Sequence, residues 1–185
     1  SIESDSIIWF QAKKYLYRFD GELTQYPLKD LGLEHSNIKD IVIDNSGNKW
    51  LSTSRNGVIK FNTKVLENFN TTNSKLPDNN IQSIFIDSKG RLFAGTWDGL
   101  FILSGKKQKV YKKFKEKSSL FGVPSTYIKY VCEDKLNNIW LLTKHDGLRK
   151  YSNGKFTRFN YWNSGHMQIN DPNCALFDSE NNLWL

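Results

Sequence analysis

A motif that returns at near-constant spacing constrains this chain of 185 residues more than any other feature. Each copy has an apolar strand that ends in Asp, then a tight turn, and then a strand that contains an aromatic residue. The aspartates that mark the copies are Asp44, Asp87, Asp134 and Asp178. They are 43, 47 and 44 residues apart. A period in the low forties that is built from strands is typical of propeller blades.

Each copy continues with a hairpin signal and then a last short strand. Asn56-Gly57, Asp98-Gly99 and Asp146-Gly147 supply the positive φ that tight hairpins require. The last strands are expected over residues 65–69, 110–114 and 155–159. Four strands per repeat form one meander, which must stack on its neighbours to bury both faces. We therefore predict an all-β fold, a β-propeller of four-stranded antiparallel blades.

The repeats make residues 1–185 one partial β-propeller. We expect a partial blade over residues 1–29, which enters at its second strand, near Ile7-Ile8-Trp9-Phe10. Full blades are expected over residues 37–70, 80–115 and 127–160, and the start of the next blade over residues 172–185. The segment then holds about four blades of a larger propeller, which we expect to have about seven in all.

The aspartates and aromatic residues of the motif are expected to be structural. Each Asp precedes a Gly or Asn by three positions, so its carboxylate can accept backbone N–H groups of its own turn. A calcium loop would need oxygen ligands at alternate positions and a distal Glu, which the segment from Asp44 to Asn48 lacks. The aromatic series is expected to pack between blades, and its members are Trp50, Phe93, Trp140 and Trp184. We predict no metal site and no cofactor.

Composition and residue placement argue against several classes of function. No apolar run approaches the length of a membrane span. Cys132 and Cys174 fall on first strands and are expected to be buried free thiols rather than a disulfide, since nothing fixes the geometry of a bridge. The three histidines lie apart, and no paired carboxylates or Ser-His-Asp arrangement can be argued. We expect no catalytic residue in this segment.

The residues of the motif also resemble a known family. From Asp44 to Val58 the pattern is Asp-x-x-Gly-Asn-x-Trp-Leu-x-Thr-x-x-Asn-Gly-Val, and it returns from Asp87 and from Asp134. This resembles the two-component regulator propeller repeat, found in extracytoplasmic sensors of hybrid histidine kinases from anaerobic glycan-degrading bacteria. The resemblance covers essentially all of the chain, although Lys14-Tyr15 stands in the first blade where Asn-Gly is expected.

The resemblance implies more than the segment contains. It implies a parent protein that is a histidine kinase of the bacterial inner membrane, with this segment on the periplasmic side. It also implies that the parent is a homodimer and that the sensor binds a glycan-derived oligosaccharide and signals across the membrane. The partners expected for the segment itself are this oligosaccharide and the rest of the same propeller.

A ligand site is expected where the loops between second and third strands gather with the loops that lead into each blade. An aromatic ring beside a carboxylate and several cations suits a sugar, and the cations favour an acidic one. The predicted ligand-binding residues are Arg55, Trp97, Asp98, Lys144 and His145. Further candidates near the axis and in the long loop of the 160s are Asn80, Tyr127, Asn170, Tyr161, Trp162 and His166.

Other classes of function stay open at this point. The same surface could serve a non-catalytic scaffold that binds another polypeptide, and some propellers are lyases or hydrolases. The net charge of +7 and the lysine-rich stretch over residues 106–117 could track phosphates or a sulfated polysaccharide. Lysines on an outer strand also protect its edge from pairing. Nucleic-acid binding is not expected, because no groove-reading element or Arg-rich cluster accompanies the lysines.

Overall fold

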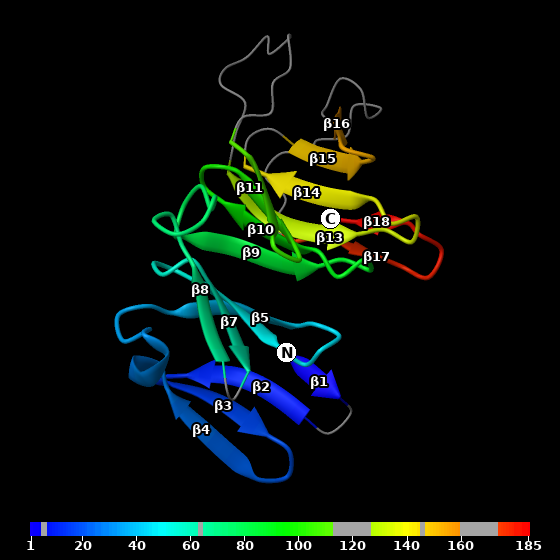
Figure 1. The fold of residues 1–185 in the computed structure, drawn as a ribbon. Helices are drawn as coiled ribbons and strands as arrows, with labels where there is room; N and C mark the ends of the chain where they lie inside the picture. The colour runs from blue at the N-terminus through cyan, green and yellow to red at the C-terminus, as the bar shows by residue number, and fades with distance from the viewer. Residues whose placement is uncertain (5–6, 63–64, 113–126, 145–146, 160–173) are drawn as a thin grey trace.

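The computed structural model describes residues 1–4, 7–62, 65–112, 127–144, 147–159 and 174–185. Over these residues the chain forms antiparallel sheets that succeed one another in sequence order (Figure 1). Four of them have four strands and the last has two. In the view of Figure 1 the four-stranded sheets run from the one that begins with β1 (Ile2–Ser4; blue, bottom) to the one that begins with β13 (Ile128–Glu133; yellow to orange, top). The predicted all-β architecture of four-stranded antiparallel blades is confirmed.

Within each four-stranded sheet every strand pairs with the next along the chain. The first sheet contains β1 (Ile2–Ser4), β2 (Ile7–Ala12), β3 (Tyr15–Phe19) and β4 (Leu23–Pro27). The second contains β5 (Ile38–Ile43), β6 (Lys49–Thr53), β7 (Val58–Asn62) and β8 (Val65–Phe69). The third contains β9 (Ile81–Ile86), β10 (Leu92–Thr96), β11 (Leu100–Ser104) and β12 (Lys107–Tyr111). The fourth contains β13 (Ile128–Glu133), β14 (Ile139–Thr143), β15 (Gly147–Ser152) and β16 (Lys155–Phe159), and β17 (Leu176–Phe177) pairs with β18 (Leu183–Trp184).

The core consists of layers between successive sheets. Trp9 and Leu16 of the first sheet pack against Leu51 and Ile59 of the second. The opposite face of the second sheet packs against the third in the same way, and the third packs against the fourth. Central strands such as β6 are therefore buried on both faces. Because fully burying a large apolar side chain contributes about 1.5–3 kcal/mol, these layers are the main source of stability.

Trp50, Phe93 and Trp140 of the aromatic series lie in these layers, as predicted, whereas Trp184 is 61% exposed, so its predicted packing between blades was wrong. Trp50 stacks at 5.8 Å on Phe69 of its own outer strand and packs against the third sheet. Trp140 lies 5.3 Å from Phe159 and 5.9 Å from Phe177 of the following sheet. These rings fasten the outer strand of one blade and the face of the next.

The structure differs from the sequence analysis in the first sheet. Residues 1–29 were expected to lack a first strand, but β1 pairs with β2 through Ile2 and Ser4 and completes four strands. β1 was missed because it is only three residues long and because the carboxylate six positions before Trp9 is Glu3 and not Asp.

A second difference concerns the outer strand of the third sheet. It was expected over residues 110–114 and instead occupies Lys107–Tyr111. Gly105 has a φ of 57° and, with Lys106, closes a two-residue turn that brings Ser104 opposite Lys107. The tight turn therefore starts β12 earlier than the apolar pattern suggests.

The two cysteines do not share one environment. Cys132 is buried, and both thiols are free. Cys174 is exposed, so its predicted burial was wrong; it lies just before β17, whose short two-stranded sheet does not cover it. Burial, with a smaller contribution from the nearby Asp134 carboxylate, raises the pKa of Cys132 to about 12.

Candidate functional site

The two ends of a sheet differ in character. One end carries the turns between first and second strands, which begin at Asp44, Asp87, Asp134 and Asp178 and which we call the Asp turns. In the first of these, Asp44 Oδ1 accepts the backbone N–H groups of Ser46 and Asn48, at 2.9 and 3.0 Å. The indole Nε1 of Trp50 donates to Asp44 Oδ2 at 2.9 Å. The predicted bonds to the turn are thus present, and the Trp adds one that was not foreseen.

The same bonds recur in the turns at Asp134 and Asp178. Asp134 accepts from the backbone of Leu136 and Asn138, and from Trp140 Nε1 at 2.8 Å. Trp184 Nε1 donates to Asp178 Oδ2 at 2.9 Å. In every case the indole belongs to the residue six positions after the carboxylate.

The turn at Asp87 reaches the same result with different side chains. Phe93 replaces Trp at the sixth position and cannot donate a hydrogen bond. Arg91 instead donates its Nε to Asp87 Oδ2 at 2.6 Å and lies over the Phe93 ring, 5.1 Å from its centroid. The Asp87 carboxylate is therefore saturated, although its aromatic neighbour is not a Trp.

The first sheet has a fifth version of this arrangement, which the sequence analysis missed. Trp9 Nε1 donates to Glu3 Oε2 at 2.6 Å, again across six positions. Glu3 Oε1 also accepts from Lys49 Nζ of the second sheet at 2.8 Å, so this carboxylate joins two blades. A carboxylate six residues before a Trp was the available signal.

These bonds also control the ionisation of the carboxylates. Burial raises the pKa of Asp44 and of Asp134, but the bonds from Trp, Asn and the backbone together outweigh it and hold both pKa values below the usual range. The indole of Trp184, followed by the backbone and side chain of Asn182, lowers the pKa of Asp178 to about 2. With their acceptor sites filled by their own turns, the Asp turns serve the fold.

The other end of each sheet carries the loops between second and third strands, which we call the hairpin tips. In the second, third and fourth sheets their base is uniform, because Thr53, Thr96 and Thr143 donate their hydroxyls to the carbonyls of Gly57, Gly99 and Gly147, respectively, at 2.8–2.9 Å. Gly57 has a φ of 77°, and a Cβ there would lie 2.1 Å from the Phe69 carbonyl oxygen. A fixed base thus presents tips whose side chains differ from sheet to sheet.

Two hairpin-tip residues meet at the ring of Tyr127, which leads into the fourth sheet. Trp97 is 52% exposed, and its ring centroid lies 5.5 Å from that of Tyr127, with the planes tilted by 40°. Lys144 Nζ lies 5.5 Å from the Tyr127 ring centroid. This group presents an exposed aromatic surface beside a cation.

A row of polar side chains continues from Tyr127 across the first strands. The Tyr127 hydroxyl donates to Gln82 Oε1 at 3.4 Å, and Gln82 Nε2 donates to Asn80 Oδ1 at 2.8 Å. Lys39 Nζ of the second sheet donates to the same Asn80 oxygen at 2.6 Å. Partial burial lowers the pKa of Lys39, an effect that Asp78 opposes. We call this row, with Trp97 and Lys144, the aromatic–polar face.

The predicted site residues are distributed unevenly over this face. Trp97 and Lys144 are brought together, and the candidates Asn80 and Tyr127 join them. Asp98 is exposed on the same tip as Trp97, and Arg55 is exposed on the tip of the preceding sheet. His145 lies outside the described residues, as do Asn170, Tyr161, Trp162 and His166.

Gln82 and Lys39 were not predicted for this site. Both lie on first strands, β5 and β9, for which no site residue was predicted. Polar residues inside otherwise apolar strands were the signal that could have found them.

No group of three or more His, Cys, Asp or Glu side chains within the described residues could hold a metal ion. Within the same part of the chain, no helix is long and apolar enough to span a membrane.

The stacked four-stranded meanders define this chain as a β-propeller segment, and comparisons with known proteins narrow the type. A family model described as "Two component regulator propeller" matches residues 75–98. This confirms the resemblance inferred from the motif: the chain carries a repeat of the two-component regulator propeller type.

A curated relative supports the same connection. "Histidine kinase P4" of Formosa agariphila is 28% identical over 198 residues, which cover 98% of this chain. The match covers 14% of the relative, so the chain corresponds to a small part of that protein.

Solved structures show the fold. The extracellular domain of a putative hybrid two component system from B. thetaiotaomicron matches 98% of this chain and 26% of its own, with a TM-score of 0.69 and 22% identity. Virginiamycin B lyase from Staphylococcus aureus matches all of this chain and 60% of its own, with a TM-score of 0.73 and 16% identity. At these identities both establish the propeller architecture alone.

Proposed function

We propose that this propeller segment belongs to the extracytoplasmic sensor of a hybrid two-component histidine kinase and that its aromatic–polar face binds a glycan-derived oligosaccharide. The observation that carries the proposal is the exposed Trp97 ring beside Tyr127, at the end of a row of hydrogen-bonding side chains. A pyranose ring has apolar C–H faces and a rim of hydroxyls. An aromatic shelf next to amide groups offers a matching partner to both.

The charges of this face bear on which sugar it takes. Lys39 and Lys144 lie at opposite ends of the row, Lys39 on Asn80 and Lys144 beside the Tyr127 ring. Cations at such a surface favour a carboxylate-bearing or sulfated sugar over a neutral one. The ligand we propose is therefore an acidic oligosaccharide.

Signalling would follow from the three blades that the face connects. Lys39, Asn80 and Tyr127 come from the second, third and fourth sheets, so a ligand bound across them contacts all three. Such a ligand favours whichever arrangement of the sensor brings those contacts together, and it shifts the population toward it. Transmission to a kinase, the periplasmic location and the homodimer stay predictions.

We also propose that this segment packs against further blades of the same propeller, because the first sheet has an exposed apolar face. Phe10 stacks on Tyr17 at 5.2 Å, and the two residues pair across β2 and β3. Leu51 and Ile59 form the equivalent pair of the second sheet and are buried against the first. The Phe10 side of the first sheet thus has the position and the apolar character of an interface with another blade.

The test is calorimetric titration of the protein with a panel of neutral and uronic-acid-containing oligosaccharides at low and high salt. We expect saturable binding to an acidic member, weakened by salt, and lost in Trp97→Ala. Phe19→Ala is the matched control, because Phe19 is also an exposed aromatic residue, at 42%, but lies on the first sheet. No binding across the panel by folded protein would refute the oligosaccharide proposal, and binding of charge-matched peptides instead would favour the protein-interaction scaffold.

A further inference from the structure

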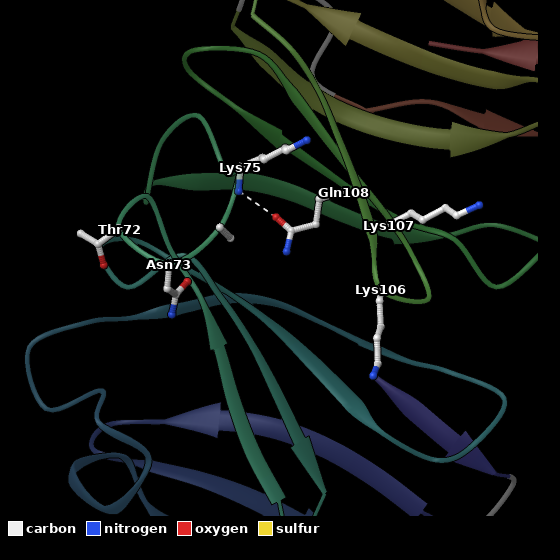
Figure 2. A pocket seen from close by; sticks show the side chains of 7 residues that line it. Thr72, Asn73, Lys75, Lys106, Lys107 and Gln108 are labelled. Atoms are coloured by element: carbon white, nitrogen blue, oxygen red, sulfur yellow. Dashed lines mark hydrogen bonds between the residues drawn. The ribbon is translucent and has the colours of Figure 1, made fainter.

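A second surface, away from the aromatic–polar face, combines a preformed loop with three exposed lysines. An open groove of about 640 Å³ lies between the loop that follows β8 and the turn from β11 to β12 (Figure 2). The described residues that line it are Thr72, Asn73, Ser74, Lys75, Lys106, Lys107 and Gln108. None of these is acidic, and the three lysines are exposed. We call this surface the lysine groove.

The loop on one side is held in place by its own hydrogen bonds. Asn70 Oδ1 accepts the backbone N–H groups of Thr72 and Asn73 at 2.9 and 3.2 Å and the Thr72 hydroxyl at 2.6 Å. Asn73 Oδ1 accepts the backbone N–H of Asn70, and Asn73 Nδ2 donates to the carbonyl oxygen of Asn68, both at 2.9 Å. Such a loop does not have to be ordered when a ligand binds, which lowers the entropic cost of binding.

One bond fastens the two sides of the groove together. The backbone N–H of Lys75 donates to Gln108 Oε1 at 2.8 Å, across 33 residues of sequence (Figure 2). This bond sets Lys75 beside the strand that carries Lys107. In Figure 2 the side chains of Lys75, Lys106 and Lys107 leave the groove in different directions. Spread cations suit an extended chain of negative charges better than one compact anion.

Protection of a sheet edge does not account for this charge. Lys75 and Lys106 lie on loops and not on the outer strand. Two equivalent outer strands, β4 and β8, contain no Lys or Arg at all. Edge protection therefore is not a general device of this chain, and gathering three like charges without an acid costs free energy through repulsion.

We propose that the lysine groove is a second binding surface, and that it takes a polyanionic polysaccharide bearing sulfate or carboxylate groups. The lysines contact the anionic groups, and the hydroxyls and amides of residues 72–74 bond to sugar hydroxyls. The lining offers no aromatic ring on which a nucleic-acid base could stack, which favours a polysaccharide over a single-stranded nucleic acid.

The test measures binding of the full chain to dextran sulfate, with neutral dextran as the ligand control. The variant Lys75→Gln/Lys106→Gln/Lys107→Gln removes the charge of the groove. The matched control, Lys29→Gln/Lys89→Gln/Lys155→Gln, removes the same charge from exposed positions on three other surfaces. We expect the groove variant to lose roughly tenfold or more in affinity and the control to stay within about twofold.

Salt dependence adds a second readout. If about three counterions are released, affinity of the unchanged protein falls roughly fortyfold between about 50 and 200 mM salt, and the groove variant falls much less. Equal loss in both triple variants would overturn the proposal, because net charge alone would then explain binding. Absence of binding to dextran sulfate would also overturn it. So would a poly-dT oligonucleotide that binds more tightly than dextran sulfate and whose binding is weakened by the same three substitutions. Trp97→Ala leaves this binding intact, so the test is independent of the oligosaccharide proposed above.

Discussion

The Asp turns and the hairpin tips lie at opposite ends of the same strands, and they differ in how uniform their bonds are. At the Asp turns a carboxylate, an indole or guanidinium and two backbone N–H groups make the same bonds in every described repeat, even where Arg91 and Phe93 replace Asn and Trp. At the hairpin tips of the second, third and fourth sheets only the buried Thr and Gly are alike, and the side chains of the tips change from Arg55 to Trp97 to Lys144. Uniform bonds therefore indicate what folds the blade, and variable exposed side chains indicate where a ligand can be selected.

The largest effect that separates the two ends is expected from removing a carboxylate at each. Asp134→Ala leaves the donors of Leu136, Asn138 and Trp140 without their acceptor, and we expect it to lower the free energy of unfolding by about 3 kcal/mol. Asp98→Ala, on a hairpin tip, is expected to change it by less than about 0.5 kcal/mol. Urea unfolding of both variants measures the difference. Equal losses of stability would show that the hairpin tips stabilise the fold as much as the Asp turns do.

Arg91 stands where the other Asp turns have Asn, and it allows a comparison among these turns. Asp87 is 4% exposed, and Arg91→Ala removes its charged partner, which we expect to cost about 2 kcal/mol. Adding Asp87→Asn to that variant should recover part of the loss, because no buried charge is then left unpaired. Lys89→Ala, an exposed residue of the same turn, is the control. If the losses of Arg91→Ala and Asp87→Asn simply add in the double variant, Arg91 stabilises the turn only by packing on Phe93.

Acid should weaken the Asp turns before it affects the hairpin tips. The folded pKa values of Asp44, Asp134 and Asp178 lie below the unfolded ones, so their contribution is present above about pH 4 and is lost as pH falls toward about 2. Asp40 opposes this, since burial raises its pKa. We expect the urea midpoint to fall between about pH 4 and 2.5, and less so in Asp134→Asn. A drop of the same size in that variant would mean that Asp134 takes no part in it.

The smallest expected effect compares two tryptophans. Trp140→Phe keeps the ring but loses the bond from Nε1 to Asp134, and we expect a loss of about 1 kcal/mol. Trp97→Phe, on an exposed tip, should change stability by less than about 0.5 kcal/mol. Thermal unfolding of the two variants is sufficient to compare them. A larger loss at Trp97 would make that ring part of the fold rather than of a ligand surface.

Much of the blade could be predicted from the sequence because its signals are local. An Asp and the donors it binds lie within six residues, and each Asn-Gly or Asp-Gly pair marks its own hairpin. The last strands expected over residues 65–69 and 155–159 are accordingly β8 and β16. The first strand was missed because Glu3 replaces Asp, although its spacing to Trp9 matches the other repeats. The start of β12 was misplaced because Gly105 closes a turn that the apolar pattern does not reveal.

The candidate site was predictable only in part. Trp97 and Lys144 were chosen because they occupy equivalent hairpin tips, which the repeat locates. Nothing in the spacing of Gln82 and Lys39 indicated that they would join the same row, because alternation along a strand gives the face of a residue and not its neighbours on other strands.

The sequence by itself determined the repeat, the turns and the stacking of apolar faces, since each depends on residues a few positions apart or on a period. Only the tertiary structure decided which polar side chains meet. Lys39 and Asn80 are 41 residues apart, Tyr127 and Gln82 are 45 apart, and Lys75 reaches Gln108 across 33. The first two separations are about one blade and the third joins the loop after one blade to the next, so these contacts depend on how far one sheet is rotated and shifted against the next. That geometry comes from the packed layer between them, which no local pattern encodes.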